Sequence, residues 1–184
     1  MFIQTEDTPN PDTLKFMPGD TVLKTGSVDF SNAESSVISP LATRLFEIEG
    51  VSRVFLSSDF ISVTKESALE WNTLKPSILT GIMEHYSSGL PALNTEADIT
   101  EVNSAEDTET IKQIKDLLET RVRPAVAMDG GDISFCSFEA GVVTLQMKGA
   151  CAGCPSSTAT LKMGIENMLR HYIPEVTEVK AAEL

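Results

Sequence analysis

The chain has 184 residues, of which 41% are hydrophobic and 22% charged, and its formal net charge at pH 7 is −13. This length suits one large domain or two small ones, each with a modest core. The negative charge excludes a nucleic-acid-binding protein, which needs a basic face, and attachment to anionic lipids. No apolar run reaches the roughly 18 residues that a membrane-spanning helix needs.

The first residues, 1–7, contain neither a basic region nor an Arg-rich amphipathic pattern, so they do not resemble a signal or transit peptide. We expect a protein that stays where it is made, or one that has lost a leader. A bacterial cytoplasm is the expected location, and the mitochondrial matrix, for a mature form, is the alternative. Three cysteines, an odd number, favour a reducing compartment over a disulfide framework.

The expected fold class is α+β, with two small domains, and residues 1–89 form the first. Ser39 and Pro40 are a favoured cap and first residue of a helix, and Gly50 is a favoured end. Alternating apolar residues predict strands, and apolar residues at spacings of three or four predict a long helix. In chain order the expected elements are extended pieces over 13–17 and 21–24, a helix over 39–50, strands over 51–56 and 60–64, and a helix over 71–86.

Residues 90–107 are predicted to be an acidic, flexible linker. They contain no aromatic and no basic residue, and their acidic side chains repel one another. The acidic residues are Glu96, Asp98, Glu101, Glu106 and Asp107. We expect this segment to be extended and to separate the flanking domains.

Residues 108–184 form the second predicted domain, with the order α-β-β-α-β. Its first helix has Asp107 or Thr108 as its cap and weakens at Pro124. Ala140 and Gly141 predict the turn of a hairpin. The expected elements are a helix over 111–122, a turn over 129–132, strands over 133–138 and 142–147, a helix over 161–172 and a short closing strand over 176–179.

Two cysteines, Cys151 and Cys154, lie between the second strand and the second helix of this domain. Their spacing lets both sulfurs turn toward one point, and the N-terminus of the following helix favours thiolate, the form that binds soft metals. We expect both sulfurs to lie at the surface. One chain provides two ligands, whereas zinc and iron–sulfur centres usually need four. A second copy of the chain would supply the missing pair.

The residues themselves leave three interpretations open: an iron–sulfur cluster, a zinc ion that links two copies as an interaction module, and a dithiol oxidoreductase. Two Cys-x-x-Cys pairs satisfy either metal. A thioredoxin-like disulfide normally lies in a parallel strand–helix–strand unit. The strands predicted before these cysteines form an antiparallel hairpin instead, which weighs against the redox interpretation.

Other reactive side chains have simpler explanations. Cys136 is predicted to be a small buried residue of a strand. His85 and His171 have no companion at ligand spacing, and His171 is expected to complement the C-terminus of its helix. Turn formation explains Asp129 and Asp132. The sequence contains no phosphate-binding loop and no Ser/His/Asp order, and we do not expect an enzyme.

Three segments resemble a known family. Val122-Arg123-Pro124-Ala125 with Met128-Asp129-Gly130-Gly131-Asp132-Ile133, followed by Gly149-Ala150-Cys151-Ala152-Gly153-Cys154-Pro155-Ser156-Ser157, closely resembles the C-terminal domain of NifU. Thr8-Pro9-Asn10-Pro11-Asp12-Thr13-Leu14-Lys15-Phe16 resembles the signature of the domain that precedes it in Nfu-type proteins. Together the two resemblances cover nearly the whole chain apart from the acidic linker.

The resemblance implies an iron–sulfur cluster scaffold or carrier, with Cys151 and Cys154 as ligands of a [4Fe–4S] cluster shared between two protomers. A [2Fe–2S] core is also possible. Apo iron–sulfur proteins would receive the cluster, and upstream assembly factors would supply it. The N-terminal domain has no cysteine, so we expect it to recognise partners or to modulate stability. The charge also predicts a mainly monomeric cluster-free chain that dimerises on loading. Neither nucleic acid nor a membrane is an expected partner.

Overall fold

The computed structural model describes residues 1–94, 107–152 and 155–182, and of residues 155–157 only the backbone. The chain divides into two compact units, Met1–Ile99 and Thr100–Leu184. Each unit combines helices with a sheet around its own apolar core, so the predicted α+β class with two domains is confirmed. Within the described ranges, no helix is both long and apolar enough to cross a bilayer.

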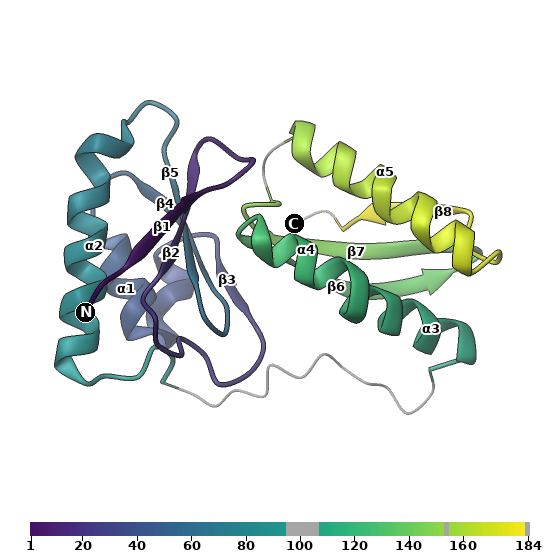
Figure 1. Cartoon of the computed structure of the whole chain (residues 1–184), viewed down its shortest axis with the longest axis horizontal. Coiled ribbons are helices and arrows are strands. Elements are labelled where there is room, and N and C mark those ends of the chain that lie inside the picture. The colour runs from purple at the N-terminus through teal and green to yellow at the C-terminus, as the bar shows by residue number, and fades with distance from the viewer. Residues whose placement is uncertain (95–106, 153–154, 183–184) are drawn as a thin grey trace. The chain divides into compact units, whose positions relative to one another are not determined.

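The N-terminal unit is an antiparallel sheet of five strands in the order β1-β2-β5-β4-β3, with its helices on one face (Figure 1). Apolar side chains of the helices pack on alternate residues of the strands, as in Leu41, Leu45 and Ile78 against Phe16 and Val54. The elements are β1 (Gln4–Asp7), β2 (Thr13–Met17), β3 (Val28–Phe30), η1 (Glu34–Ile38), α1 (Pro40–Phe46), β4 (Val51–Leu56), β5 (Ile61–Lys65) and α2 (Trp71–Ser88).

The predicted cap of α1 is confirmed, because the Ser39 hydroxyl accepts the N–H of Ala42 at 3.0 Å. The prediction of an extended piece over 21–24 is wrong. Val22 and Leu23 both donate their N–H groups to the carbonyl of Ser58, and their side chains enter the core. The two adjacent apolar residues anchor a loop to the core, and strand β3 follows a few residues later.

Each described end of the predicted linker is attached to the unit of which it is part. Ala92 and Leu93 pack against the N-terminal core, and the N–H of Asn94 donates to the carbonyl of Ile38 at 2.8 Å. At the other end, Asp107 forms an ion pair with Lys115 at 2.5 Å. Residues 95–106 lie outside the described part of the chain, so the flexible acidic linker stays a prediction.

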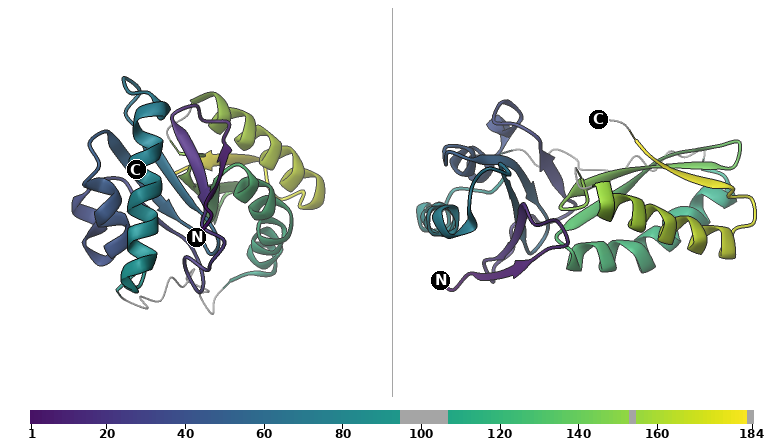
Figure 2. Two further views of the ribbon diagram at one scale, coloured as in Figure 1. Left: turned by 60° about the vertical axis from the view of Figure 1, so that its left-hand side comes forward. Right: turned by 90° about the horizontal axis from the view of Figure 1, so that it is seen from above.

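The C-terminal unit packs its helices on one face of a three-stranded sheet, in the order β6-β7-β8 (Figure 2). Strands β6 and β7 are antiparallel, and β8 is parallel to β7. The elements are α3 (Glu109–Leu117), η2 (Leu118–Val122), α4 (Arg123–Met128), β6 (Gly131–Glu139), β7 (Val142–Gly149), α5 (Pro155–Tyr172) and β8 (Glu178–Ala181). This order agrees with the predicted α-β-β-α-β pattern.

The first helix of this unit begins at the predicted cap, where the Thr108 hydroxyl accepts the N–H of Ile111 at 3.4 Å. It passes Pro124, where we expected it to weaken, and continues as α4 to Met128. Proline has no N–H to donate, and the π-helical turn η2 comes directly before α4. The wider turn lets the chain resume as a helix with Pro124 in its first turn, where a missing donor has no cost.

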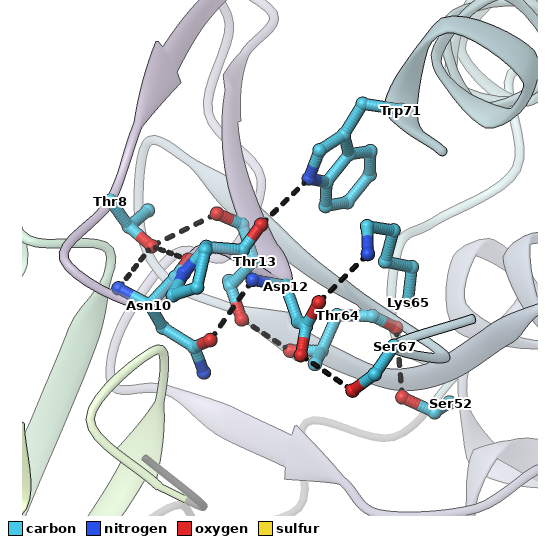
Figure 3. A network of polar contacts seen from close by, with 10 residues as sticks. Thr8, Asn10, Asp12, Thr13, Ser52, Thr64, Lys65, Ser67 and Trp71 are labelled. Carbon is cyan, nitrogen blue, oxygen red and sulfur yellow. Dashed lines mark hydrogen bonds and ion pairs between the residues drawn. The ribbon is translucent and has the colours of Figure 1, made fainter. Parts of the chain in front are cut away.

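The Nfu-type signature in the N-terminal unit forms the closed loop between β1 and β2. The Thr8 hydroxyl donates to the carbonyl oxygens of Asn10 and Thr13, both at 2.9 Å, and the Asn10 side chain accepts the N–H of Asp12 at 3.0 Å (Figure 3). Asp12 then pairs with Lys65, with 2.7 Å between Oδ1 and Nζ. Local hydrogen bonds of this kind explain why Thr, Asn and Asp occupy a turn.

The same loop is attached to the start of α2. The indole N–H of Trp71 donates to the carbonyl of Pro11 at 3.0 Å, and the Lys65 ammonium lies 5.8 Å from the centre of the Trp71 ring (Figure 3). Ser67 donates to the second carboxylate oxygen of Asp12 at 2.7 Å. The signature therefore joins four elements, β1, β2, β5 and α2, and its residues have structural partners.

Replacing Asp12 with Ala should lower the free energy of unfolding by about 1–2 kcal/mol, because Lys65, whose side chain is 7% exposed, would lose its counter-charge. Urea titration of the single variant measures this. Glu84→Ala is the matched control, since the Arg44–Glu84 pair is far more exposed and should contribute less than about 1 kcal/mol. Equal losses in the two variants would contradict the structural role of Asp12.

Candidate functional site

Cys151 lies in the short connection between β7 and α5, at one end of the three-stranded sheet. The backbone on both sides is fixed: Ala150 donates its N–H to the carbonyl of Gly130 at 3.2 Å, and Ala152 donates to Gly149 at 3.0 Å. The Thr158 hydroxyl, in α5, donates to the carbonyl of Cys151 at 2.8 Å. The backbone around Cys151 is therefore held by three segments: the turn before β6, the end of β7 and the first turns of α5.

The side chain of Cys151 is buried, which contradicts our expectation of a surface position. The residue is 6% exposed and belongs to the apolar core cluster of the C-terminal unit, which also contains Ile133 and Met147. Its sulfur faces the bare Cα of Gly131: a Cβ built on that glycine would lie 2.6 Å from Sγ. A side chain at position 131 would occupy the space that the sulfur fills.

Burial, and then the negative charges of the nearby Asp129 and Asp132, raise the pKa of the Cys151 thiol to about 12. The sequence led us to expect the opposite, a thiolate favoured by the helix N-terminus. Desolvation and the two negative charges outweigh any such contribution in this conformation. The sulfur has the chemistry of an iron or zinc ligand, but it must emerge from the core and lose its proton before it can bind metal.

Cys154, the second predicted ligand, lies outside the described residues. Its role as a ligand therefore stays a prediction. Among the residues that are described, no three or more His, Cys, Asp or Glu side chains gather as a metal-binding group.

An ion pair fixes the start of β6 beside Cys151. Arg123, the first residue of α4, donates to both carboxylate oxygens of Asp132, with Nε–Oδ1 and Nη2–Oδ2 distances of 3.0 Å. Its remaining nitrogen, Nη1, donates to Glu119 at 2.6 Å. The predicted turn over 129–132 is correct for Asp129 and Gly130, which follow α4, whereas Gly131 and Asp132 already begin β6. Gly130 adopts a positive φ of 79°. Asp132 additionally ties that turn to the helix, which we did not anticipate.

The prediction that Cys136 is buried is wrong. The residue is exposed, because the pairing of β6 with β7 shifts between Phe135 and Ser137 and leaves Cys136 as the extra residue of a β-bulge. The bulge changes the alternation, so that Phe135 and Phe138 both pack against the core. Partial burial of its side chain raises the pKa of the Cys136 thiol, although the residue as a whole is exposed.

Neither histidine takes part in the site. His85 is 1% exposed in the core-facing side of α2, where burial, and then the charge of Arg44, lowers its pKa. His171 is exposed in the last turn of α5, the helix end where we expected it.

The strand context of Cys151 differs from the one that we expected. Because β8 is parallel to β7, the connection that contains Cys151 does lie in a parallel strand–helix–strand unit. The topology therefore does not weigh against redox chemistry. The state of the thiol does: an attacking cysteine needs a lowered pKa, whereas burial raises that of Cys151.

Comparison with known proteins identifies the family to which both units of the chain belong. Residues 3–89 match the family model described as the N-terminal domain of the scaffold protein Nfu/NifU, and residues 114–180 match the NifU-like domain. The chain is 53% identical to NifU-like protein 4, mitochondrial, of Arabidopsis thaliana over 185 residues, which are 98% of this chain and 65% of that protein. It is also 53% identical to the NFU1 iron-sulfur cluster scaffold homolog, mitochondrial, of Homo sapiens over 181 residues, 98% of this chain and 71% of that protein.

The solution structure of a NifU-like protein from Saccharomyces cerevisiae covers 52% of this chain and 87% of its own, with 26% identity and a TM-score of 0.47. The two units thus match two domain models of one family, in succession along the chain. This chain belongs to the Nfu/NifU family. It spans about two thirds of the length of the curated relatives that it matches.

The burial of Cys151 predicts slow modification. A chain whose only thiol is Cys151 (Cys136→Ser with Cys154→Ser) should react with iodoacetamide near neutral pH at least about tenfold more slowly than one whose only thiol is Cys136. Because the pKa of Cys151 is raised to about 12, its rate should still climb about tenfold per pH unit in alkaline buffer. A plateau of that rate below about pH 9 would contradict the assignment.

Proposed function

We propose that this chain is a non-enzymatic carrier that binds an iron–sulfur cluster through Cys151 and Cys154 of two protomers and delivers it to apo-proteins. A [4Fe–4S] cluster is the proposed cargo, with [2Fe–2S] as the alternative core. Each protomer contributes two thiolates, and two protomers complete the four ligands that such clusters take from cysteine. Upstream assembly factors are the proposed source of the cluster.

Membership of the Nfu/NifU family is the observation that carries this proposal, because a relative at 53% identity is named an iron-sulfur cluster scaffold. The position of Cys151 adds to it. A cysteine between a strand and a helix, held by its backbone rather than by its side chain, can turn its sulfur outward without disturbing the sheet. Gly149, with a positive φ of 62°, gives the end of β7 additional conformational range.

Two other functions compete with this one. A zinc-linked interaction module would use the same four sulfurs, and metal analysis separates it from an iron–sulfur carrier. A dithiol oxidoreductase would need Cys151 or Cys154 as an exposed thiolate, and the buried, protonated Cys151 weighs against it.

Transfer in the proposed mechanism is a ligand exchange. On loading, each thiol gives its proton to solvent and its sulfur binds iron. On delivery, thiolates of the recipient take the place of the carrier's thiolates, one new iron–sulfur bond for each one broken, and no electron is transferred. Cys151 then takes up a proton and can return to the apolar core, so that burial of the free thiol favours release.

The proposed setting of this carrier is the mitochondrial matrix. Both relatives described above bear the word mitochondrial in their names, which supports this alternative. The bacterial cytoplasm, our first expectation from the sequence, receives no support from them. Apo iron–sulfur proteins of the same compartment are the proposed recipients.

Replacing either Cys151 or Cys154 with Ala should abolish cluster binding and leave the fold intact, because each removes a proposed ligand. Anaerobic reconstitution with iron and sulfide, followed by absorbance at roughly 400 nm and by metal analysis, measures this. Cys136→Ala is the matched control and should bind as the parent chain does, since Cys136 lies on a bulge of β6. A brown double variant lacking both Cys151 and Cys154 would show that the ligands lie elsewhere.

The shared cluster also predicts a change of oligomeric state. The cluster-free chain, with its net charge of −13, should elute with the mass of one protomer, and the reconstituted chain with the mass of two. Size-exclusion chromatography with light scattering under anaerobic conditions measures both. An unchanged mass after loading would count against a bridged site. Return to the protomer mass after chelation of the iron would show that the cluster holds the dimer together.

A further inference from the structure

The contact between Gly131 and Cys151 is closer than a substituted residue would allow. A Cβ on Gly131 would lie 2.6 Å from the sulfur of Cys151, 2.8 Å from the carbonyl oxygen of Lys148 and 3.1 Å from the amide nitrogen of Cys151. The last two atoms belong to the backbone, which cannot yield as a flexible side chain can. Any residue with a side chain at position 131 must therefore displace the Cys151 sulfur or open the sheet at this end.

The strand pairing makes displacement of the backbone costly. Gly131 pairs with Gly149, and Asp132 pairs with Lys148, in the antiparallel ladder of β6 and β7. Ala150 extends this attachment by donating its N–H to Gly130. The glycine and the cysteine backbone are thus held by the same ladder, and the sulfur is the part that is free to move.

Arg123 fixes the same strand end from the helical side. Its two parallel hydrogen bonds to Asp132 hold the residue that directly follows Gly131, and Asp132 is only 6% exposed. Asp132 also accepts the N–H of Ile133 at 2.8 Å, which sets the direction of its carboxylate. The first residue of α4 thereby determines where the start of β6 lies against the cysteine connection.

We infer that Gly131, held in place by the Arg123–Asp132 pair, is a positioning residue for the cysteine that carries the cargo: it keeps the Cys151 sulfur buried in the cluster-free chain. Loading then requires the sulfur to leave this contact, and delivery allows it to return. The biological meaning of Cys151 in this inference rests on the proposed function, whereas the contact itself is a property of the cluster-free chain.

The test uses the chain whose only thiol is Cys151 (Cys136→Ser with Cys154→Ser), without iron or sulfide. Gly131→Ala should raise the rate of Cys151 alkylation by iodoacetamide about tenfold, because the added Cβ excludes the sulfur from its buried position. Gly164→Ala is the matched control: it makes the same substitution in the same unit, where a Cβ meets nothing within 4 Å. This control should leave the rate unchanged.

A second variant keeps the inference testable if Gly131→Ala fails to fold. Arg123→Lys leaves both charges of the pair in place. A lysine, however, cannot form two parallel hydrogen bonds to the Asp132 carboxylate. It should raise the alkylation rate about threefold by loosening the strand end. Because no net charge changes, an increase reports geometry rather than electrostatics near the sulfur.

Urea separates local release of the sulfur from general destabilisation. Local release predicts rates that stay flat in urea concentrations below the unfolding transition, because little surface is exposed. Rates that rise steeply with urea would instead mean that the variants react through global unfolding, and would overturn the inference. It would also be overturned if folded Gly131→Ala and Arg123→Lys both reacted within about twofold of the parent.

This outcome is independent of the reconstitution experiment. If the chain with all three cysteines bound no iron–sulfur cluster while both variants of the single-thiol chain released the sulfur as described, the proposed function would fail and the positioning role of Gly131 would stand. If the cluster bound but neither variant changed the alkylation rate, the function would stand and the role of Gly131 would fail.

Discussion

The pairing of Gly131 with Gly149 is the constraint on which the C-terminal unit depends. This register brings the turn after α4 and the connection after β7 to the same end of the sheet. A slip of one residue would place the side chain of Asp132 where the bare Cα of Gly131 now meets the Cys151 sulfur, and would reverse the faces of the whole strand. The Arg123–Asp132 pair opposes such a slip, because its two hydrogen bonds require one position of the strand relative to α4.

The N-terminal unit is organised by a comparable use of charge, at a loop rather than a strand end. Asp12 joins Lys65 and Ser67, and Trp71 attaches the same loop to α2. These side chains are occupied with one another, so the signature that identifies the domain is explained by its own folding. The unit contains no cysteine, so it supplies no thiolate to the proposed cluster site.

Much of this fold could be predicted from local patterns. Ser39 and Thr108 mark helix starts, and Ala140 with Gly141 marks the hairpin turn, because each acts through hydrogen bonds or dihedral angles within a few residues. The direction of β8 was not accessible, since Val176 and Val179 indicate a strand without indicating its neighbour. The exposure of Cys136 was missed for a related reason: a bulge inserts one residue, and alternation alone carries no sign of it.

The site shows the same division. The spacing of Cys151 and Cys154 and the order of motifs indicated the family, which the comparisons support. The state of the Cys151 thiol depended on tertiary structure: its sulfur packs against a glycine twenty residues earlier in the chain, beside two carboxylates. The glycines and aspartates over 129–132 were visible in the sequence, but nothing local connects them to a cysteine that follows the end of β7.

Burial of Cys151 affects the balance between retention of the iron–sulfur cluster and its delivery. Under the proposed function, the hydrophobic interior of the C-terminal unit and the inorganic cargo compete for one sulfur atom. Changes that tighten this interior would make the carrier slower to load and quicker to unload, whereas changes that loosen it would have the reverse effect. Packing of this interior would then be limited in both directions, because tighter packing raises thermal stability but weakens retention of the cargo.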